Sequence, residues 1–537
     1  MRNVILAFLP LFFSSASAIA QENSYAKKSS IFDGIETEYE MQVSASNGNT
    51  PLWLNANKYG LSSVKSSNGF VRGAIKRDIR NDDSKKWGVG YGLDLAVAYN
   101  YQSSVMLQQA YLEGRYKRGS LTIGSKYQKM ELKNQRLSSG AQALGINARP
   151  IPQVRLALED YWTIPGLKKW ISIKGHIAYG IMTDGCWQKE FTQKQSKWTE
   201  NALYHSKAGF LKIGKDERPF SVELGLEMAA IFGGTVNWFD NNGKLVTFKG
   251  GTKLKNFWHA FIPGGSDFEE EEKGYVNIEG NHLGSWLARF SYQFNSIGIS
   301  LYADHYFEDH SALYHLGNYG YGKDGDWQKR SSKFYLYPLK DGLLGMELNF
   351  KRCSFVRNVV VEFINTRYQS GPIYHDHSET IFDQIGGQDN YYNHEYYPGW
   401  QYYGQVIGNP LYLSPIYNKE NSLYNKEYLL DNKENLHYNK ENLLTIKNNR
   451  FFAWHFGLDG NIISDLSYRI LASWQKGLGT YRNPYNKPKK NFSLLAELSY
   501  NCEKWLDGLE LHLSYGQDKG EILGNNNGVQ FSVIFRR

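Results

Sequence analysis

The feature that most constrains the fold of this chain is a strict alternation of apolar and polar residues. It is clearest from Trp87 to Asn100, where every odd position is apolar or aromatic and every even position is small or polar. A helix would scatter these residues around its axis, whereas a strand places them on opposite faces. The same alternation recurs over 221–228 and 529–536. The chain is therefore predicted to consist of strands with one apolar face.

Composition supports a membrane setting for these strands. The 537 residues include 39 Tyr, 28 Phe and 14 Trp, or 15% aromatic residues, yet the mean hydropathy is −0.53. Alternating strands with apolar outer and polar inner faces give such a balance. The net charge of +8 does not indicate a nucleic-acid partner. Cys186, Cys353 and Cys502 are odd in number and far apart, so they predict neither a disulfide framework nor a metal site.

Residues 1–20 are predicted to be a secretory signal peptide. Arg2 supplies the positive charge, 4–13 form the apolar run, and Ala18-Ile19-Ala20 gives the cleavage site before Gln21. The apolar run is too short for a transmembrane helix, and no later stretch approaches the ~18 apolar residues that such a helix needs. We expect the mature chain, 21–537, to be periplasmic, secreted or an outer-membrane β-barrel.

Eighteen segments have the character of strands, with boundaries uncertain by about two to four residues. Many strands of about ten residues joined by tight turns are typical of an up-and-down antiparallel barrel. A soluble sandwich or propeller alternates too, but aromatic residues at strand ends favour a membrane girdle. The predicted strands are 36–46, 69–79, 87–100, 107–117, 120–129, 153–160, 171–182, 203–214, 219–232, 285–295, 297–307, 343–351, 355–366, 452–463, 467–476, 492–502, 508–516 and 529–536.

Long polar insertions separate these strands, and we expect them to form extracellular loops that carry recognition, with some folding inward as a plug. One insertion contains a heptad repeat over 417–444, in which Asn-Lys-Glu recurs from 418, 425, 432 and 439. A period of seven suggests a coiled coil, but Asn is a poor helix former. We interpret the repeat as an expansion within an exposed loop. The insertions are 129–152, 183–202, 233–284, 308–342 and 367–451.

Signals for catalysis or metal binding are weak, and no catalytic residue, metal or cofactor is predicted. His375 and His377 lack a third placed ligand, and the acidic run 269–272 is typical of a solvated surface. A polar cluster could perform acid–base chemistry, although hydrogen bonding at a loop rim is the more common role of such residues. The cluster comprises Asp304, His305, Glu308, Asp309, His310 and His315.

The densest signal is the stretch from Asp389 to Tyr403, in which seven residues of 391–403 are aromatic. Aromatic faces beside Asn, Asp and His side chains suit a sugar, because its C–H face stacks while its hydroxyls take hydrogen bonds. An interfacial aromatic belt or packing inside the barrel would explain the stretch equally well. The candidate polysaccharide-binding residues are Asp389, Asn390, Tyr391, Tyr392, His394, Tyr396, Tyr397 and Trp400.

Several motifs in the same order resemble the capsule assembly Wzi family of outer-membrane proteins. The most specific are 280–285 (GNHLGS) and 389–410 (DNYYNHEYYPGWQYYGQVIGNP), beside GFVRGAI, SSGAQALGINARPIPQV and KGLGTYRNPY. The resemblance implies an 18-stranded barrel closed by a plug, where the residues alone also allow 16 strands. It also implies lectin-like retention of polysaccharide without catalysis. The chain departs from such barrels at its end, where Arg536 and Arg537 follow an aromatic residue.

The expected function is therefore that of an outer-membrane protein of a Gram-negative bacterium that binds capsular or extracellular polysaccharide and helps to assemble or retain it. The other expected partners are outer-membrane lipid and the outer-membrane assembly machinery. Two alternatives remain. One is a porin-like nutrient channel, and the other is an outer-membrane hydrolase or acyltransferase with its site at the Asp304–His310 cluster.

Overall fold

The structure is a computed structural model in which 36–537 form one unit, separate from 1–35. The predicted signal peptide, 1–20, lies outside the described residues, as does most of the heptad repeat. The described residues are 32–82, 84–194, 196–215, 217–240, 243–262, 280–308, 319–321, 329–331, 340–369, 389–394, 396–420 and 443–537.

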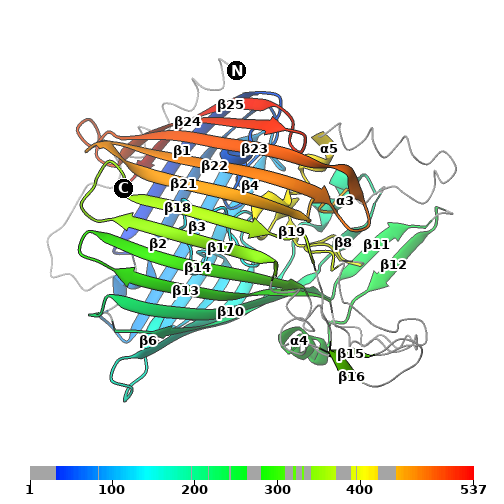
Figure 1. Cartoon of the computed structure of the whole chain (residues 1–537), viewed down its shortest axis with the longest axis horizontal. Helices are drawn as coiled ribbons and strands as arrows, with labels where there is room; N and C mark the ends of the chain where they lie inside the picture. The colour runs from blue at the N-terminus through cyan, green and yellow to red at the C-terminus, as the bar shows by residue number, and fades with distance from the viewer. Residues whose placement is uncertain are drawn as a thin grey trace. The chain divides into compact units, whose positions relative to one another are not determined.

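Eighteen antiparallel strands form one sheet, which confirms the predicted fold class (Figure 1). Each strand pairs with the next along the sheet, and the last, β25, pairs with the first, β1, so that the sheet closes into a barrel. The strands are β1 (Ile35–Asn47), β2 (Ser67–Arg77), β3 (Trp87–Tyr99), β4 (Val105–Tyr116), β5 (Gly119–Ser125), β6 (Gln153–Thr163), β7 (Ile171–Ile181), β9 (Leu203–Ile213), β10 (Phe220–Phe232), β13 (Asn281–Gln293), β14 (Ile297–Glu308), β17 (Gly342–Phe350), β18 (Asn358–Asn365), β21 (Phe451–Ile463), β22 (Leu466–Gly479), β23 (Pro484–Asn501), β24 (Leu509–Gly520) and β25 (Asn526–Arg536).

The period-two pattern places apolar side chains on the outside of the barrel. In β3 the apolar odd positions are exposed except for the half-buried Tyr91, whereas Gly88, Asp94 and Ala96 on the even face are buried. Leu112 and Leu344 on other strands are 69% and 62% exposed. A band of exposed apolar side chains around a closed sheet suits contact with lipid. Among the described residues, no helix is long and apolar enough to cross a membrane.

The two ends of the barrel differ in the length of their connections. At one end, here the short-turn end, all connections are brief: 78–86, 117–118, 164–170, 214–219, 294–296, 351–357, 464–465 and 502–508. At the other, the long-loop end, they are 48–66, 100–104, 126–152, 182–202, 233–280, 309–341, 366–450, 480–483 and 521–525. Outer-membrane barrels place their short turns in the periplasm. We therefore assign the long-loop end to the cell exterior.

The long-loop connections contain further short elements. A three-stranded sheet comprises β8 (Trp198–Glu200), β11 (Thr235–Phe239) and β12 (Leu245–Lys249), and Figure 1 shows β11 and β12 projecting beyond the barrel strands. Two strand pairs are β15 (Tyr319–Tyr321) with β16 (Lys329–Ser331), and β19 (Gln401–Tyr402) with β20 (Gln405–Val406). The helices are α2 (Leu52–Asn55), η1 (Ile79–Asp82, at the short-turn end), α3 (Gly185–Thr192), α4 (Leu254–Phe261), η3 (Pro410–Tyr412) and α5 (Tyr417–Glu420).

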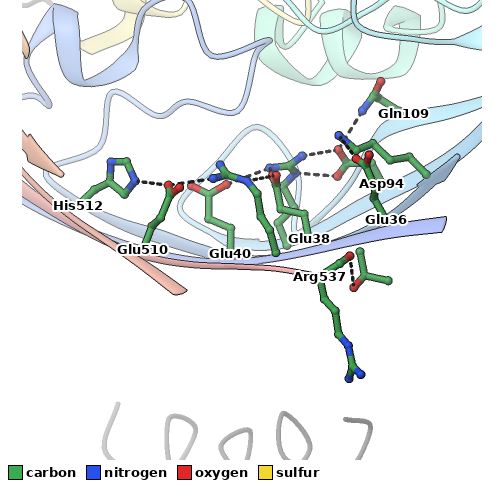
Figure 2. A network of polar contacts seen from close by, with 12 residues as sticks. Glu36, Glu38, Glu40, Asp94, Gln109, Glu510, His512 and Arg537 are labelled. Carbon is green, nitrogen blue, oxygen red and sulfur yellow. Dashed lines mark hydrogen bonds and ion pairs between the residues drawn. The ribbon is translucent and has the colours of Figure 1, made fainter. Parts of the chain in front are cut away.

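An ion-pair network inside the barrel lies across the closure between β25 and β1. Arg536 Nε lies 2.8 Å from a Glu38 carboxylate oxygen on β1, and its Nη1 lies 2.8 Å from Glu510 on β24. Arg72 on β2 continues the network to Glu38 at 2.7 Å and to Asp94 at 2.8 Å (Figure 2). Arg536, which follows the last aromatic residue of the chain, therefore joins the final strand to the first.

Four connecting segments, here called the plug, pack inside the barrel. They are 50–64, 126–152, 389–416 and 443–450, and they share one buried apolar cluster with inward-facing strand residues. Buried acids of the barrel wall hold the plug. Asp304 on β14 lies 2.6 Å from Lys133 Nζ, and Glu362 on β18 accepts hydrogen bonds from Ser138 Oγ at 2.6 Å and from Ser139 N at 2.8 Å. The predicted strand 120–129 ends early, at Ser125, because the chain turns there into the plug.

The orientation of the barrel can be tested with its own cysteines. Cys186 is exposed in α3 at the long-loop end, Cys353 is exposed in the 351–357 turn at the other end, and Cys502 is buried. A maleimide attached to a polymer too large for porins should label intact cells through Cys186 alone. Cys186→Ser should abolish that labelling, and Cys353 should react only after the outer membrane is permeabilised. Labelling of Cys353 in intact cells would reverse the assignment of the two ends.

Candidate functional site

The predicted sugar-binding stretch lies largely in the core of the plug. Tyr391, Tyr392, Tyr397 and Trp400 are each at most 3% exposed. Trp400 and Tyr392 are among the largest fully buried side chains in the described part of the chain. A ring that stacks on a sugar needs one open face. In this structure these four rings therefore have a packing role, and their contact with a sugar stays a prediction.

The polar groups of these buried aromatic residues are bonded within the barrel. Tyr392 donates its hydroxyl hydrogen to the Gln142 carbonyl and accepts from Asn409 N at 3.0 Å. Trp400 Nε1 donates to the Ala143 carbonyl at 3.0 Å, and Tyr397 donates to the Gly233 carbonyl at 3.0 Å. Buried Tyr and Trp need such partners. The bonds to Gln142 and Ala143 tie the 389–416 segment to the 126–152 segment.

The aromatic rings of the plug also pack against aromatic rings of the barrel wall and form much of the apolar core. Tyr392 stacks on Tyr412 with centroids 3.9 Å apart, and Tyr306 on β14 meets Tyr391 edge-on at 4.7 Å. Tyr412 meets Phe451 of β21 edge-on at 5.0 Å. The plug and the inner faces of the strands therefore share one apolar cluster, to which both contribute rings. The structure gives these rings a packing role inside the barrel, one of the interpretations open from the sequence, and their contact with a sugar stays untested.

The other four candidates, Asp389, Asn390, His394 and Tyr396, are partly exposed. His394 Nδ1 accepts hydrogen bonds from Tyr396 N at 3.1 Å and Tyr397 N at 3.3 Å, so it fixes the turn that presents Tyr396. Tyr396 stacks on Phe248 of β12 with centroids 5.1 Å apart. The structure thus brings an imidazole and two aromatic rings together at the long-loop end.

The hairpin of β11 and β12 extends this surface and was missed by the sequence analysis. Lys197 Nζ lies 5.3 Å from the ring centroid of the half-exposed Trp238 on β11, and Phe239 next to it is 44% exposed. Asn241-Asn242-Gly243 between two short apolar runs is a hairpin signal that could have located it. We call Trp238, Phe248, His394 and Tyr396 the loop-end aromatic surface.

The residues of the candidate acid–base cluster do not come together, because neighbouring residues of β14 face opposite sides of the sheet. Asp304 faces the plug, where its carboxylate pairs with Lys133 and accepts from Gln142 N at 2.9 Å. His305 is on the opposite face of β14, and its Nδ1 donates to the Asp341 carbonyl at 2.8 Å. Asp309, His310 and His315 lie outside the described residues, as do His375, His377 and the acidic run 269–272.

The base of the heptad-repeat loop is fixed to the plug. Asn418 Nδ2 donates to the carbonyls of Leu443 and Thr445, both at 2.8 Å. These bonds join the two ends of the repeat, while 421–442 lie outside the described residues. Its interpretation as an expansion within an exposed loop stays a prediction.

The bonds of Tyr392 predict a local loss of plug stability in Tyr392→Phe. The change leaves the Gln142 carbonyl and the Asn409 amide without partners in a buried site, at a cost of about 1–3 kcal/mol. Amide hydrogen exchange in 389–416 should become faster, while the barrel strands stay protected. Tyr481→Phe is the matched control, because Tyr481 bonds the Tyr368 carbonyl at 2.8 Å from a half-exposed position where water can substitute. Equal exchange in the two variants would contradict this role.

We expect the turn that His394 holds through the amides of Tyr396 and Tyr397 to lose stability in acid. Burial, with a smaller contribution from Lys197, lowers the pKa of His394 to about 4. An unfolded imidazole titrates near ~6.5, so between these values the unfolded turn binds more protons than the folded one. The stability of the turn should therefore fall as the pH falls from about 6.5 to about 4.

Limited proteolysis of 389–400 at about pH 7 and about pH 5 measures this loss. His394→Asn keeps an acceptor for the two amides but does not titrate, so its proteolysis should change less with pH than that of the wild type. Burial raises the pKa of Asp341 to about 6, so this carboxyl also titrates between the two pH values. The contribution of His394 is therefore the difference in pH dependence between the wild type and His394→Asn. A wild-type pH dependence that His394→Asn retains in full would refute the assignment.

Comparisons with known proteins bear on the fold. No protein-family model matches the sequence, and no curated protein matches it. A solved structure with a similar fold is that of Wzi, described as an outer-membrane protein involved in group 1 capsule assembly in Escherichia coli and as a carbohydrate-binding β-barrel. The alignment covers 93% of this chain and 84% of Wzi, with a TM-score of 0.52 and 11% sequence identity.

Two other barrels align with lower scores. OprD of Pseudomonas aeruginosa covers 94% of both chains at 7% identity and a TM-score of 0.42. OccAB4 of Acinetobacter baumannii aligns over 94% of this chain and 98% of its own at 8% identity and a TM-score of 0.42. These weaker similarities carry no functional argument. At such low identities the comparisons show the fold, and that fold is an outer-membrane β-barrel.

Proposed function

We propose that this protein resides in the outer membrane of a Gram-negative bacterium, binds surface polysaccharide there and helps to assemble or retain it without catalysis. The observation that carries the proposal is the loop-end aromatic surface on a barrel whose interior holds a bonded plug. The rings of Phe248 and Tyr396 stack at the long-loop end, beside the imidazole of His394 and the ammonium group of Lys197. Such neighbours offer stacking faces and hydrogen-bond partners to a sugar.

The plug supports a binding role over transport. Its segments are held by buried bonds, such as that between Lys133 and Asp304, which would have to break for the plug to leave the barrel. Removing one partner of a buried ion pair costs several kcal/mol, on the order of 3–5. Among the described residues, the nutrient-channel and hydrolase alternatives have no comparable observation in their favour, while Asp309, His310 and His315 of the hydrolase candidate lie outside them.

The similarity to Wzi agrees with this proposal. That protein is described as carbohydrate-binding and as involved in capsule assembly. We transfer the class of ligand, a surface polysaccharide, and place its contacts on the loop-end aromatic surface. A repeating polymer can occupy many such barrels at once, so weak single sites add up through avidity.

Deletion of the gene, followed by complementation, tests the proposal. Cells without the protein should release polysaccharide into the medium, and wild-type protein should restore the cell-bound fraction. Tyr396→Ala should restore less, because it removes the ring that stacks on Phe248. Tyr99→Ala is the control, since Tyr99 is an exposed aromatic residue on the outer face of β3 near the same end. Heat-dependent mobility in gels should show both variants folded.

Two outcomes separate the function from the site. A deletion strain that keeps its normal cell-bound polysaccharide would refute the function. If deletion causes release and Tyr396→Ala restores the cell-bound polysaccharide in full, Tyr396 is not part of the binding surface. The proposed function would then still hold.

A further inference from the structure

The barrel contains a second feature, a cavity of about 1020 Å³ between the plug and the wall. At one end it is lined by residues of the short-turn connections 78–86 and 117–118, among which Lys86 and Arg118 are exposed. At the other end it is capped by plug residues, including Leu144, Ala148 and Ile407. The cavity therefore opens at the end assigned to the periplasm. Its volume is at the upper limit of pockets that hold small ligands.

The lining of this cavity is strongly basic. Eleven Lys and Arg residues line it against six Asp and Glu residues. Several acids are already paired within it, as in Lys126 with Glu113 at 2.7 Å and Arg80 with Asp160 at 3.3 Å. Lys129 and Arg149 have no ion pair among the described residues. The excess positive charge in a cleft with low-dielectric walls attracts anions.

Arg149, which lines this cavity, has a buried guanidinium whose hydrogen-bonding capacity is not met. It is 9% exposed, and its Nε and Nη2 have no hydrogen-bond partner in the described structure. Its guanidinium lies 4.2 Å from the ring centroid of Tyr403, a contact that supplies no hydrogen-bond acceptor in the plane of the guanidinium. Burial lowers the pKa of this guanidinium. An unpaired buried cation is unfavourable, and an anion within reach would relieve that cost.

The backbone holds Arg149 in this position. Gly60 N donates to the Asn147 carbonyl at 2.9 Å, and Gly60 has φ +71. A Cβ on Gly60 would lie 2.7 Å from Arg149 N, so only glycine allows the two plug segments to come this close. The guanidinium is therefore presented by a fixed backbone and does not depend on a mobile loop.

Aromatic rings in the same cavity narrow the class of ligand. Tyr59 and Tyr127, both half-exposed, line it and stack with centroids 4.0 Å apart. Rings suit the C–H faces of sugars, and guanidinium groups suit carboxylates. We propose that this cavity binds the carboxylate-bearing sugars of an acidic polysaccharide from the periplasmic side. The inference rests on the proposed function and specifies an acidic polymer and a second, internal site.

Calorimetric titration of the purified full-length barrel tests the inference. Tetragalacturonate should bind, its methyl ester should bind at least about tenfold more weakly, and added salt should weaken the acid form. Arg149→Gln and Lys129→Gln should each reduce the affinity for tetragalacturonate about tenfold. Lys169→Gln is the matched control, because Lys169 is exposed in the 164–170 turn at the same barrel end, outside the cavity.

Each outcome decides for or against the cavity. Lys129 is exposed, so Lys129→Gln carries the test if Arg149→Gln does not fold in the gel-mobility assay. Equal binding of acid and ester, or wild-type affinity in the folded cavity variants, would overturn the inference. So would a tetraglutamate peptide that binds as tightly as tetragalacturonate, since the site would then not select sugars. If the cavity fails these binding tests while cells with the protein still retain their polysaccharide, the inference is wrong but the proposed function holds.

Discussion

The structure depends on the pairing of β1 with β25. Within the hydrocarbon core of a membrane no water can satisfy an open sheet edge, so only a closed sheet lets every strand bond to two neighbours. Ion pairs between side chains reinforce the backbone hydrogen bonds of this closure. Arg536 joins Glu38 on the first strand to Glu510 on the next-to-last, and Arg72 joins Glu38 to Asp94. Because closure turns one face of every strand inward, the charged and polar side chains of that face line the interior.

That polar interior explains how the plug is held and why it is aromatic. Glu362 is fully buried, and it accepts hydrogen bonds from Tyr302, Ser138 and the backbone of Ser139. A buried carboxylate without such partners would be strongly unfavourable. The backbone and polar side chains of the plug supply hydrogen-bond partners to the buried groups of the wall. Within the plug, tyrosine and tryptophan rings provide the apolar packing. These residues suit the task because each has a large apolar body and one polar atom that reaches a partner.

The strands could be predicted from the sequence because their signal is local. Trp87 to Tyr99 alternates residue by residue, and the structure places that alternation across a sheet with apolar positions outside. The plug could not be predicted in the same way. Nothing local distinguishes Tyr392, buried against Tyr412, from Tyr396, which is half-exposed four positions later. The difference arises from contacts between segments far apart in the chain, such as Tyr392 with Gln142.

The plug also connects the two ends of the barrel through Arg149. This residue lines the basic cavity, and its guanidinium lies against the ring of Tyr403. Tyr403 N in turn donates to Asp184 at 3.0 Å, at the start of α3 on the long-loop end. An anion bound to Arg149 would interact with the same guanidinium that contacts the Tyr403 ring. A ligand bound in the proposed cavity site would therefore act on the segment that continues directly from Trp400, so the two proposed sites would share structural support.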